Sequence, residues 1–373
     1  MKRIFFVALS ATLLAAGCQK TEIINHVGGD VMTFTPAMSK LTKASDADSS
    51  GTNNLQAQNF KVWAYCAYED AINSVEYGDV YDQISALDVT YDDGAWTTEL
   101  DYYWPGTAKK LDFFAVSTGA TWAVPAGEGT EAVAGVEWDI TNGGTETIGA
   151  GVRTLEVKGY TVNHTSPNDD LMVSEFVRQD QSMNDKKVKL HFKHALAKVQ
   201  FKFLTNSAQT DNVLVDSLVV AGLKTTGNLT VTETAENYGT EDKTGRAKVS
   251  LAWEPADAVA DFSDDYDGDL TLTAEAQEYA TWLVLPQDIT GKTVKIKYTI
   301  NGRAFEQIFA LTRPAVVEEK DDQGNVVTEG KDAFATWGIN QVVIYTINLS
   351  PNKITFDPSV ENWAAETPQT DVN

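Results

Sequence analysis

Short runs rich in Val, Ile, Tyr, Phe and Trp recur along the chain from Phe60 onward, and clusters of turn residues separate them. Breakers such as Asp93-Gly94, Asn142-Gly143-Gly144 and Asn301-Gly302 lie between the runs. This spacing is typical of antiparallel all-β sandwiches. Amphipathic patterns with a helical period are scarce, so we expect few, short helices. The expected strands lie at 61–68, 111–116, 188–203, 213–220, 281–285, 294–300 and 342–349.

Two shorter segments, near the two ends of the chain, follow the same pattern of alternating apolar and small or polar residues. Residues 32–38 read MTFTPAM and residues 354–360 read ITFDPSV, with Thr, Phe and Pro in register. Proline within each segment predicts an edge strand, because proline cannot donate a hydrogen bond to a neighbouring strand. They are either two unrelated edge strands or two strands that fit the same kind of site. With a period of two, one face of each carries Met32, Phe34, Pro36 and Met38, and Ile354, Phe356, Pro358 and Val360, respectively.

The first 17 residues have the pattern of a bacterial lipoprotein signal peptide. Lys2 and Arg3 precede an apolar run at 4–14, and small residues lead to Cys18. The run is shorter than the roughly 20 residues of a membrane-spanning helix, and it fits a cleaved signal. We therefore expect lipid on Cys18 to attach the chain to a membrane. An ordinary signal peptide followed by an incidental cysteine is the alternative.

The 373 residues predict two domains, at about 150 residues each. A polar stretch near residue 180 indicates a boundary, giving an N-terminal segment at 18–45, one β-sandwich at 46–182 and a second at 183–373. The net charge of −24 argues against nucleic-acid partners, since phosphate would be repelled. With Cys18 lipidated, Cys66 has no second cysteine in the chain, which excludes a disulfide framework.

Candidate chemistry is sparse, and we expect no catalytic residues, no metal and no cofactor. His191 and His194 lie at an odd offset in a predicted strand, so they point to opposite faces. Ser117 lacks the helix that follows a nucleophile elbow. The stretch containing Ser263, Asp265, Asp267 and Gly268 resembles a calcium loop but lacks its final Glu. A solvated acidic turn is the expectation there, with a weak calcium site as the alternative.

Taken in order, several motifs make the chain similar to the fimbrillins, the subunits of type V pili of Gram-negative gut and oral bacteria. The resemblance extends over nearly the whole chain after Cys18. It rests on residues 60–68, Tyr103-Trp104-Pro105, 111–115, Asp170-Leu171-Met172-Val173, 192–199, 223–229 with Gly227, Trp337, 343–349 and 354–363.

The resemblance implies two tandem transthyretin-like Greek-key sandwiches in an outer-membrane lipoprotein precursor that forms an adhesive surface fimbria. It further implies that a surface trypsin-like protease removes an N-terminal plug strand, and that a C-terminal donor strand of another copy, or of a related pilin, replaces it. The matching cleavage site is Lys43-Ala44, although the family more often has Arg at the first position. The plug row is 32, 34, 36 and 38, and the donor row is 354, 356, 358 and 360.

A different class of function stays open at this stage. The chain has nine Trp, and exposed aromatic rings can stack on sugars. A monomeric surface lipoprotein that binds glycans or host ligands is therefore the second hypothesis, and a coplanar aromatic pair at the surface would favour it.

Overall fold

The computed structural model describes residues 30–38, 59–67, 77–80, 84–104, 110–118, 135–141, 152–164, 166, 169–179, 186–206, 212–237, 246–321, 323, 326–328, 330–350 and 353–363. The all-β prediction is confirmed, because every regular element in these ranges is a strand. Of the few short helices that we expected, these ranges contain only a single residue in a 3-10 conformation, Lys186. They accordingly contain no helix with the length and hydrophobicity to cross a membrane.

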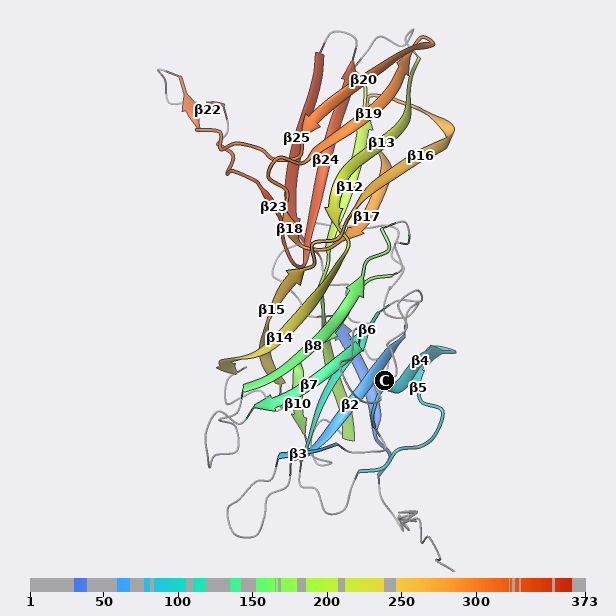
Figure 1. The fold of residues 1–373 in the computed structure, drawn as a ribbon, viewed down its shortest axis with the longest axis vertical. Coiled ribbons are helices and arrows are strands. Elements are labelled where there is room, and N and C mark those ends of the chain that lie inside the picture. The colour runs from blue at the N-terminus through green and yellow to red at the C-terminus, as the bar shows by residue number, and fades with distance from the viewer. Residues whose placement is uncertain are drawn as a thin grey trace, which may run out of the picture.

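The largest sheet has thirteen strands and fills the lower part of the molecule in Figure 1. Its main order is β1-β11-β9-β6-β10-β15-β14-β8-β7, and β2 branches from β6 toward β3, β4 and β5. The strands are β1 (Thr33–Met38), β2 (Phe60–Ala67), β3 (Tyr77–Val80), β4 (Leu87–Asp92), β5 (Ala95–Thr97), β6 (Lys110–Ser117), β7 (Gly135–Thr141), β8 (Val152–Thr161), β9 (Met172–Ser174), β10 (Phe176–Gln179), β11 (Lys187–His194), β14 (Thr226–Asn237) and β15 (Arg246–Pro255).

The upper part is a sandwich of two four-stranded sheets, with orders β17-β12-β24-β25 and β16-β13-β19-β20. Two small pairs, β18 with β23 and β21 with β22, complete it. The strands are β12 (Ala197–Leu204), β13 (Val213–Lys224), β16 (Val259–Thr271), β17 (Gln277–Val284), β18 (Gln287–Asp288), β19 (Thr293–Ile300), β20 (Arg303–Ala310), β21 (Glu319–Lys320), β22 (Val326–Thr328), β23 (Thr336–Trp337), β24 (Gln341–Ser350) and β25 (Lys353–Asn362).

The chain passes between the two parts three times, from β11 to β12, from β13 to β14 and from β15 to β16. The predicted boundary at 182–183 falls before β11, yet β11, β14 and β15 all belong to the thirteen-stranded sheet. Sheet pairing therefore does not follow the predicted division. At one crossing Gly227 lies opposite Pro255, where an added Cβ would be 3.0 Å from the Glu254 carbonyl oxygen.

Strands β2 and β6 are buried on both faces of the large sheet. On β6, Phe114 and Val116 join a core that continues into the upper sandwich, and Phe113 and Ala115 join a second core cluster. Leu155 of β8 lies in the same core as Phe114, so the sheet curls over and packs against itself. The N-terminal sandwich is thus made from one continuous sheet.

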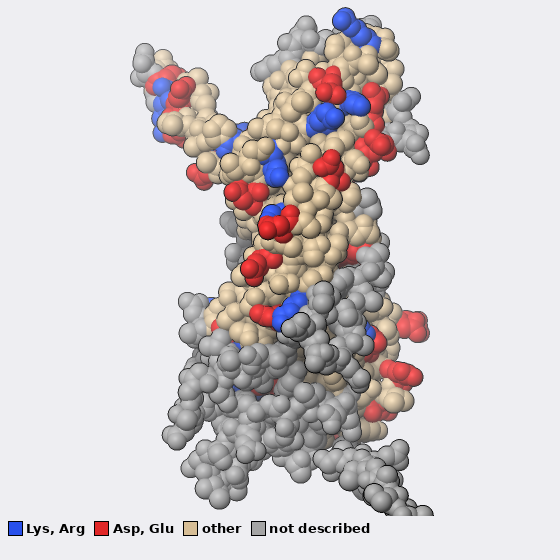
Figure 2. Space-filling view, viewed as in Figure 1, with Lys and Arg blue, Asp and Glu red and all other residues tan. Residues whose placement is uncertain are grey.

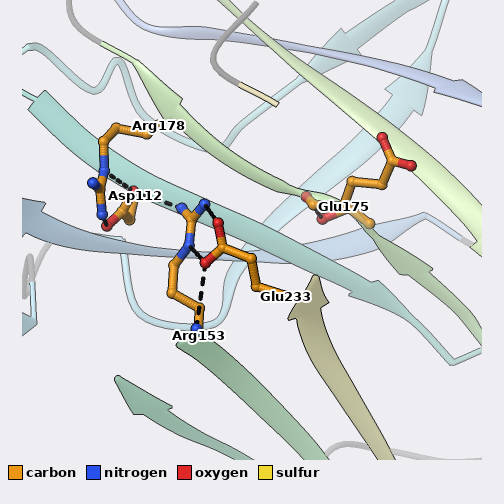
Figure 3. Close-up of polar contacts among 6 residues, drawn as sticks. Asp112, Arg153, Glu175, Arg178 and Glu233 are labelled. Carbon is orange, nitrogen blue, oxygen red and sulfur yellow. Dashed lines mark hydrogen bonds and ion pairs between the residues drawn. The ribbon is translucent and has the colours of Figure 1, made fainter. Parts of the chain in front are cut away.

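A buried ionic network ties this curled sheet together (Figure 3). Arg153 of β8 donates through Nη1 to Asp112 of β6 at 2.8 Å, and through Nε and Nη2 to the Glu233 carboxylate of β14 at 2.8 and 2.9 Å. Arg178 of β10 donates to both oxygens of Asp112. Asp112 is 1% exposed, so these arginines supply the hydrogen bonds that water would otherwise give its carboxylate.

We expect Arg153→Ala to lower the free energy of unfolding by about 3 kcal/mol, because it leaves Asp112 and Glu233 with fewer partners in a buried setting. Urea denaturation followed by circular dichroism measures the change. Lys61→Ala is the matched control, since the Lys61–Asp88 pair is largely exposed and its loss should cost less than about 1 kcal/mol. Equal losses in the two variants would contradict a structural role for the network.

Candidate functional site at the two terminal strands

The first strand, β1, lies at one edge of the large sheet and runs parallel to β11. The register extends from Thr33 opposite Lys187 to Met38 opposite Phe192. At its start, the Met32 N–H donates to the Tyr102 carbonyl at 2.7 Å, on the side away from β11. The beginning of β1 is therefore held from both sides.

The apolar row of β1 covers the second core cluster. Met32 and Phe34 are 3% and 4% exposed, and the Phe34 ring meets Phe113 edge-on with 6.2 Å between centroids. Pro36 is half-buried. Met38 is the last residue of the strand, and its side chain lies outside the described part. The predicted row thus faces inward at Met32 and Phe34.

The last strand, β25, lies at the edge of a sheet in the upper sandwich. It runs antiparallel to β24 along its whole length, from Lys353 opposite Ser350 to Asn362 opposite Gln341. Phe356 stacks on Phe309 of β20 with 5.0 Å between ring centroids. Both predicted edge strands are therefore present, and each is engaged within its own chain.

The predicted row of β25 is less deeply buried than that of β1. Ile354 and Phe356 are half-buried and pack against the main core. Pro358 is buried, whereas Val360 is 40% exposed. All four lie opposite inward-facing residues of β24, so they share one face as expected.

Tyr345 of β24 supports this row from beneath, opposite Pro358. Its ring stacks on Phe356 with 5.1 Å between centroids. Its hydroxyl donates to the Leu311 carbonyl at 3.1 Å and accepts from the Trp337 indole N–H at 3.0 Å. Burial raises the pKa of Tyr345, so the hydroxyl stays protonated and keeps donating across the whole neutral range.

An arm formed by residues 312–335, which include the β21–β22 pair, projects from the upper sandwich (Figures 1 and 2). Residues at the base of this arm contact β25. The Arg313 guanidinium donates to the Pro358 carbonyl. Lys331 Nζ lies 2.7 Å from both carboxylate oxygens of Asp357. Sequence reasoning missed these contacts, because the 317–333 stretch shows only an acidic, glycine-bearing loop. No local signal links it to a strand about 25 residues later.

The described end of the chain is held by a second contact that sequence reasoning missed. Trp363 stacks on the ring of His194 with 3.9 Å between centroids and 4° between planes. His194 Nδ1 in turn hydrogen-bonds the buried carboxylate of Asp170. Since His194 is the last residue of β11, the strand that pairs with β1 also contacts the residue that follows β25.

Three predicted site residues lie outside the described residues, namely Cys18, Lys43 and Ala44. Lipidation and processing therefore stay predictions. His191 and His194 alternate on β11 as expected, the first half-buried and the second buried on the inner side.

The expected acidic turn at 263–268 is wrong. Ser263 and Asp265 belong to the strand β16 and lie opposite Val219 and Ser217 of β13. An extended strand places the side chains of Ser263 and Asp265 on one face but about 7 Å apart, whereas a calcium loop curls so that its oxygen ligands converge at about 2.5 Å from one ion. Within the described ranges, no group of three or more His, Cys, Asp or Glu side chains could hold a metal ion.

The tryptophans do not form an exposed sugar-stacking surface in the described part. Trp96 and Trp253 are half-buried, and the other five tryptophans whose side chains are described are buried. The near-coplanar pair Phe309 and Phe356 packs against the main core. The glycan-binding alternative therefore gains no support from these side chains.

A family model described as fimbrillin-like matches residues 42–363. The chain belongs to the fimbrillin-like family. The match begins after β1 and ends at Trp363, the residue that follows β25. Membership supports a structural subunit for fimbriae or adhesion at the cell surface, which assembles with other pilin copies.

Solved structures resemble this fimbrillin-like chain at low sequence identity. A fimbrial protein from Bacteroides vulgatus is 16% identical, with a TM-score of 0.45, over 89% of this chain and 99% of that one. The tip fimbrial protein Mfa3 from Porphyromonas gingivalis, with a C-terminal truncation, is 10% identical, with a TM-score of 0.31, over 82% and 94%. No curated protein matches the chain.

We expect Phe34→Ala to lower the free energy of unfolding by about 3 kcal/mol, because it removes a buried ring from the second core cluster. Urea denaturation measures the loss. Thr33→Ala is the control on the same strand, since Thr33 is exposed and should stay within about 0.5 kcal/mol of the parent protein. If both variants match the parent, β1 contributes nothing to stability.

Proposed function

We propose that this fimbrillin-like chain is a non-catalytic subunit of an adhesive surface fimbria that assembles by exchanging terminal strands between copies. The observation that supports it best is the pair of edge strands β1 and β25. They lie at opposite ends of the described chain and carry matching inward rows, with Phe34 and Phe356 in corresponding positions.

In this proposal, the lipid on Cys18 brings the precursor to the outer membrane surface. A trypsin-like protease then cuts between Lys43 and Ala44, which separates β1 and the lipid from the rest of the chain. Each copy that loses β1 gains an open groove and loses its tether at the same step.

The groove would expose the side chains that β1 now covers, among them Phe113, Leu190 and Phe192. It would also leave the β11 edge without hydrogen-bond partners. An incoming strand supplies both backbone bonds and a matching apolar row. Four apolar side chains contribute a gross gain of roughly 6–12 kcal/mol, from about 1.5–3 kcal/mol each. Ordering the strand offsets a large part of that gain.

The contact is heterologous, because the groove of one copy receives the strand of another. Such contacts propagate into a fibre instead of closing into a dimer. The donor must first leave its own sheet, where it pairs with β24 along ten residue pairs. We therefore expect free subunits to persist for some time after cleavage.

Mild trypsin treatment should convert the purified full-length protein into rods visible by electron microscopy. Mass spectrometry should show that the assembled chains begin at Ala44. The control is the double variant Lys40→Gln/Lys43→Gln, because trypsin also cuts after Lys40 in the same segment, and this variant should stay monomeric under the same treatment. Filaments that retain a lipidated Cys18 would contradict removal of the N-terminal segment.

Phe356→Asp should abolish rods while the uncleaved monomer stays folded by circular dichroism. The reason is that a charge in the donor row cannot enter an apolar groove. Ser359→Asp adds the same charge on the exposed face of β25 and should still assemble. If Phe356→Asp unfolds the monomer, Phe356→Ala provides the milder test. Unchanged rods in the folded variant would rule out β25 as the donor.

A further inference from the structure

The outward face of β11 carries a row of positive charge, which is unusual on a chain with a net charge of −24. Lys187, Lys189 and Lys193 alternate with the buried residues Val188, Leu190 and Phe192. Lys193 reaches the buried carboxylate of Glu175 at 3.0 Å. Lys187 and Lys189 are exposed, and neither forms an ion pair within the described part of the chain.

The strand that now lies beside this row is uncharged. On β1, Thr33 lies opposite Lys187, Thr35 opposite Lys189, and Ala37 opposite His191. Directly opposed side chains of neighbouring strands stabilise the pairing when they carry opposite charges and destabilise it when their charges are alike. The residues of β1 opposite Lys187 and Lys189 are uncharged, so β1 forms no ion pair with these lysines.

The corresponding face of β25 is acidic. Between its inward residues lie Thr355, Asp357, Ser359 and Glu361, and both acids are exposed. When Phe356 takes the position of Phe34, Asp357 takes the position of Thr35. Four residues further along the strand, Glu361 comes to the position opposite Lys193.

We propose that a charge match selects the incoming strand: Asp357 of one copy pairs with Lys189 of the next, and Glu361 joins Lys193. The occupant of the β11 edge is then β25 of a second copy of this chain. This inference rests on the proposed strand exchange and adds what distinguishes the donor from β1. The apolar rows of the two strands are nearly the same, whereas their outward faces differ by two negative charges.

Asp357 changes partners in this scheme. In the free subunit its carboxylate contacts Lys331 of the arm at 2.7 Å, and the Arg313 guanidinium lies 4.0 Å away. On exchange, the lysine of another copy replaces Lys331 of the same chain. One ion pair is therefore exchanged for another, and the acid is not left unpaired in either state.

The test is a double-mutant cycle on protein that is purified at full length and then cleaved. Mass spectrometry confirms that every cleaved variant begins at Ala44. The critical concentration for sedimentable filaments is measured for the parent, Lys189→Glu, Asp357→Lys and the double variant. Each single variant should raise the critical concentration about fivefold, because opposite charges become like charges. The double variant should return to within about twofold of the parent.

Lys187→Glu is the matched control, since it reverses a lysine equally exposed on the same strand but opposite Thr355. It should change the critical concentration by less than about twofold. The Asp357–Lys189 coupling should also shrink at 0.5 M salt, because exposed charges are screened. Melting of the uncleaved variants checks that each one folds.

The possible outcomes distinguish a failure of the charge match from a failure of the proposed strand exchange. Filaments in the parent with no rescue in the double variant would overturn the charge match and leave strand exchange standing. An effect of Lys187→Glu as large as that of Lys189→Glu would also overturn it. A parent protein that forms no filaments after verified cleavage would overturn the strand exchange itself, and the charge match with it.

Discussion

Strand β6 is buried on both faces, and much of the N-terminal half depends on this double burial. One face, with Phe114, packs into the core that continues to the upper sandwich. The other, with Phe113, would meet water if β1 did not bring Met32 and Phe34 over it. An edge strand of six residues thus closes a core that the rest of the sheet leaves open. Removal of β1 would therefore expose the apolar side chains of this core.

Alternation of apolar and polar residues was enough to predict the all-β class, the strands β1 and β25, and the shared inward face of Met32 and Phe34. It could not predict their partners. The parallel pairing of β1 with β11 joins residues about 150 positions apart, and periodicity carries no information on such pairing. For the same reason, the passage of β14 and β15 back into the large sheet escaped prediction. The acidic 263–268 stretch was misjudged because pairing with β13 outweighs its low strand propensity.

Arginine is rare in this acidic chain, and half of its arginines pair with buried carboxylates. The sequence has six arginines. Arg153, Arg178 and Arg246 bind buried carboxylates, and Arg313 binds the backbone of β25. A planar, always charged guanidinium suits such fixed, multidentate contacts better than the flexible ammonium of lysine. The exposed positive charges on β11 are the lysines Lys187 and Lys189, whose side chains lie outside the core.

Pro358 has a consequence for the width of any assembly. In an antiparallel strand, the N–H and C=O of one residue point to the same side. The Pro358 carbonyl accepts from Arg313, away from β24, so the nitrogen without a hydrogen also faces the open edge of the sheet. At this point the edge has no donor, and its acceptor is already occupied. A second sheet therefore cannot form a continuous hydrogen-bonded ladder along β25, and this edge resists side-by-side association of subunits.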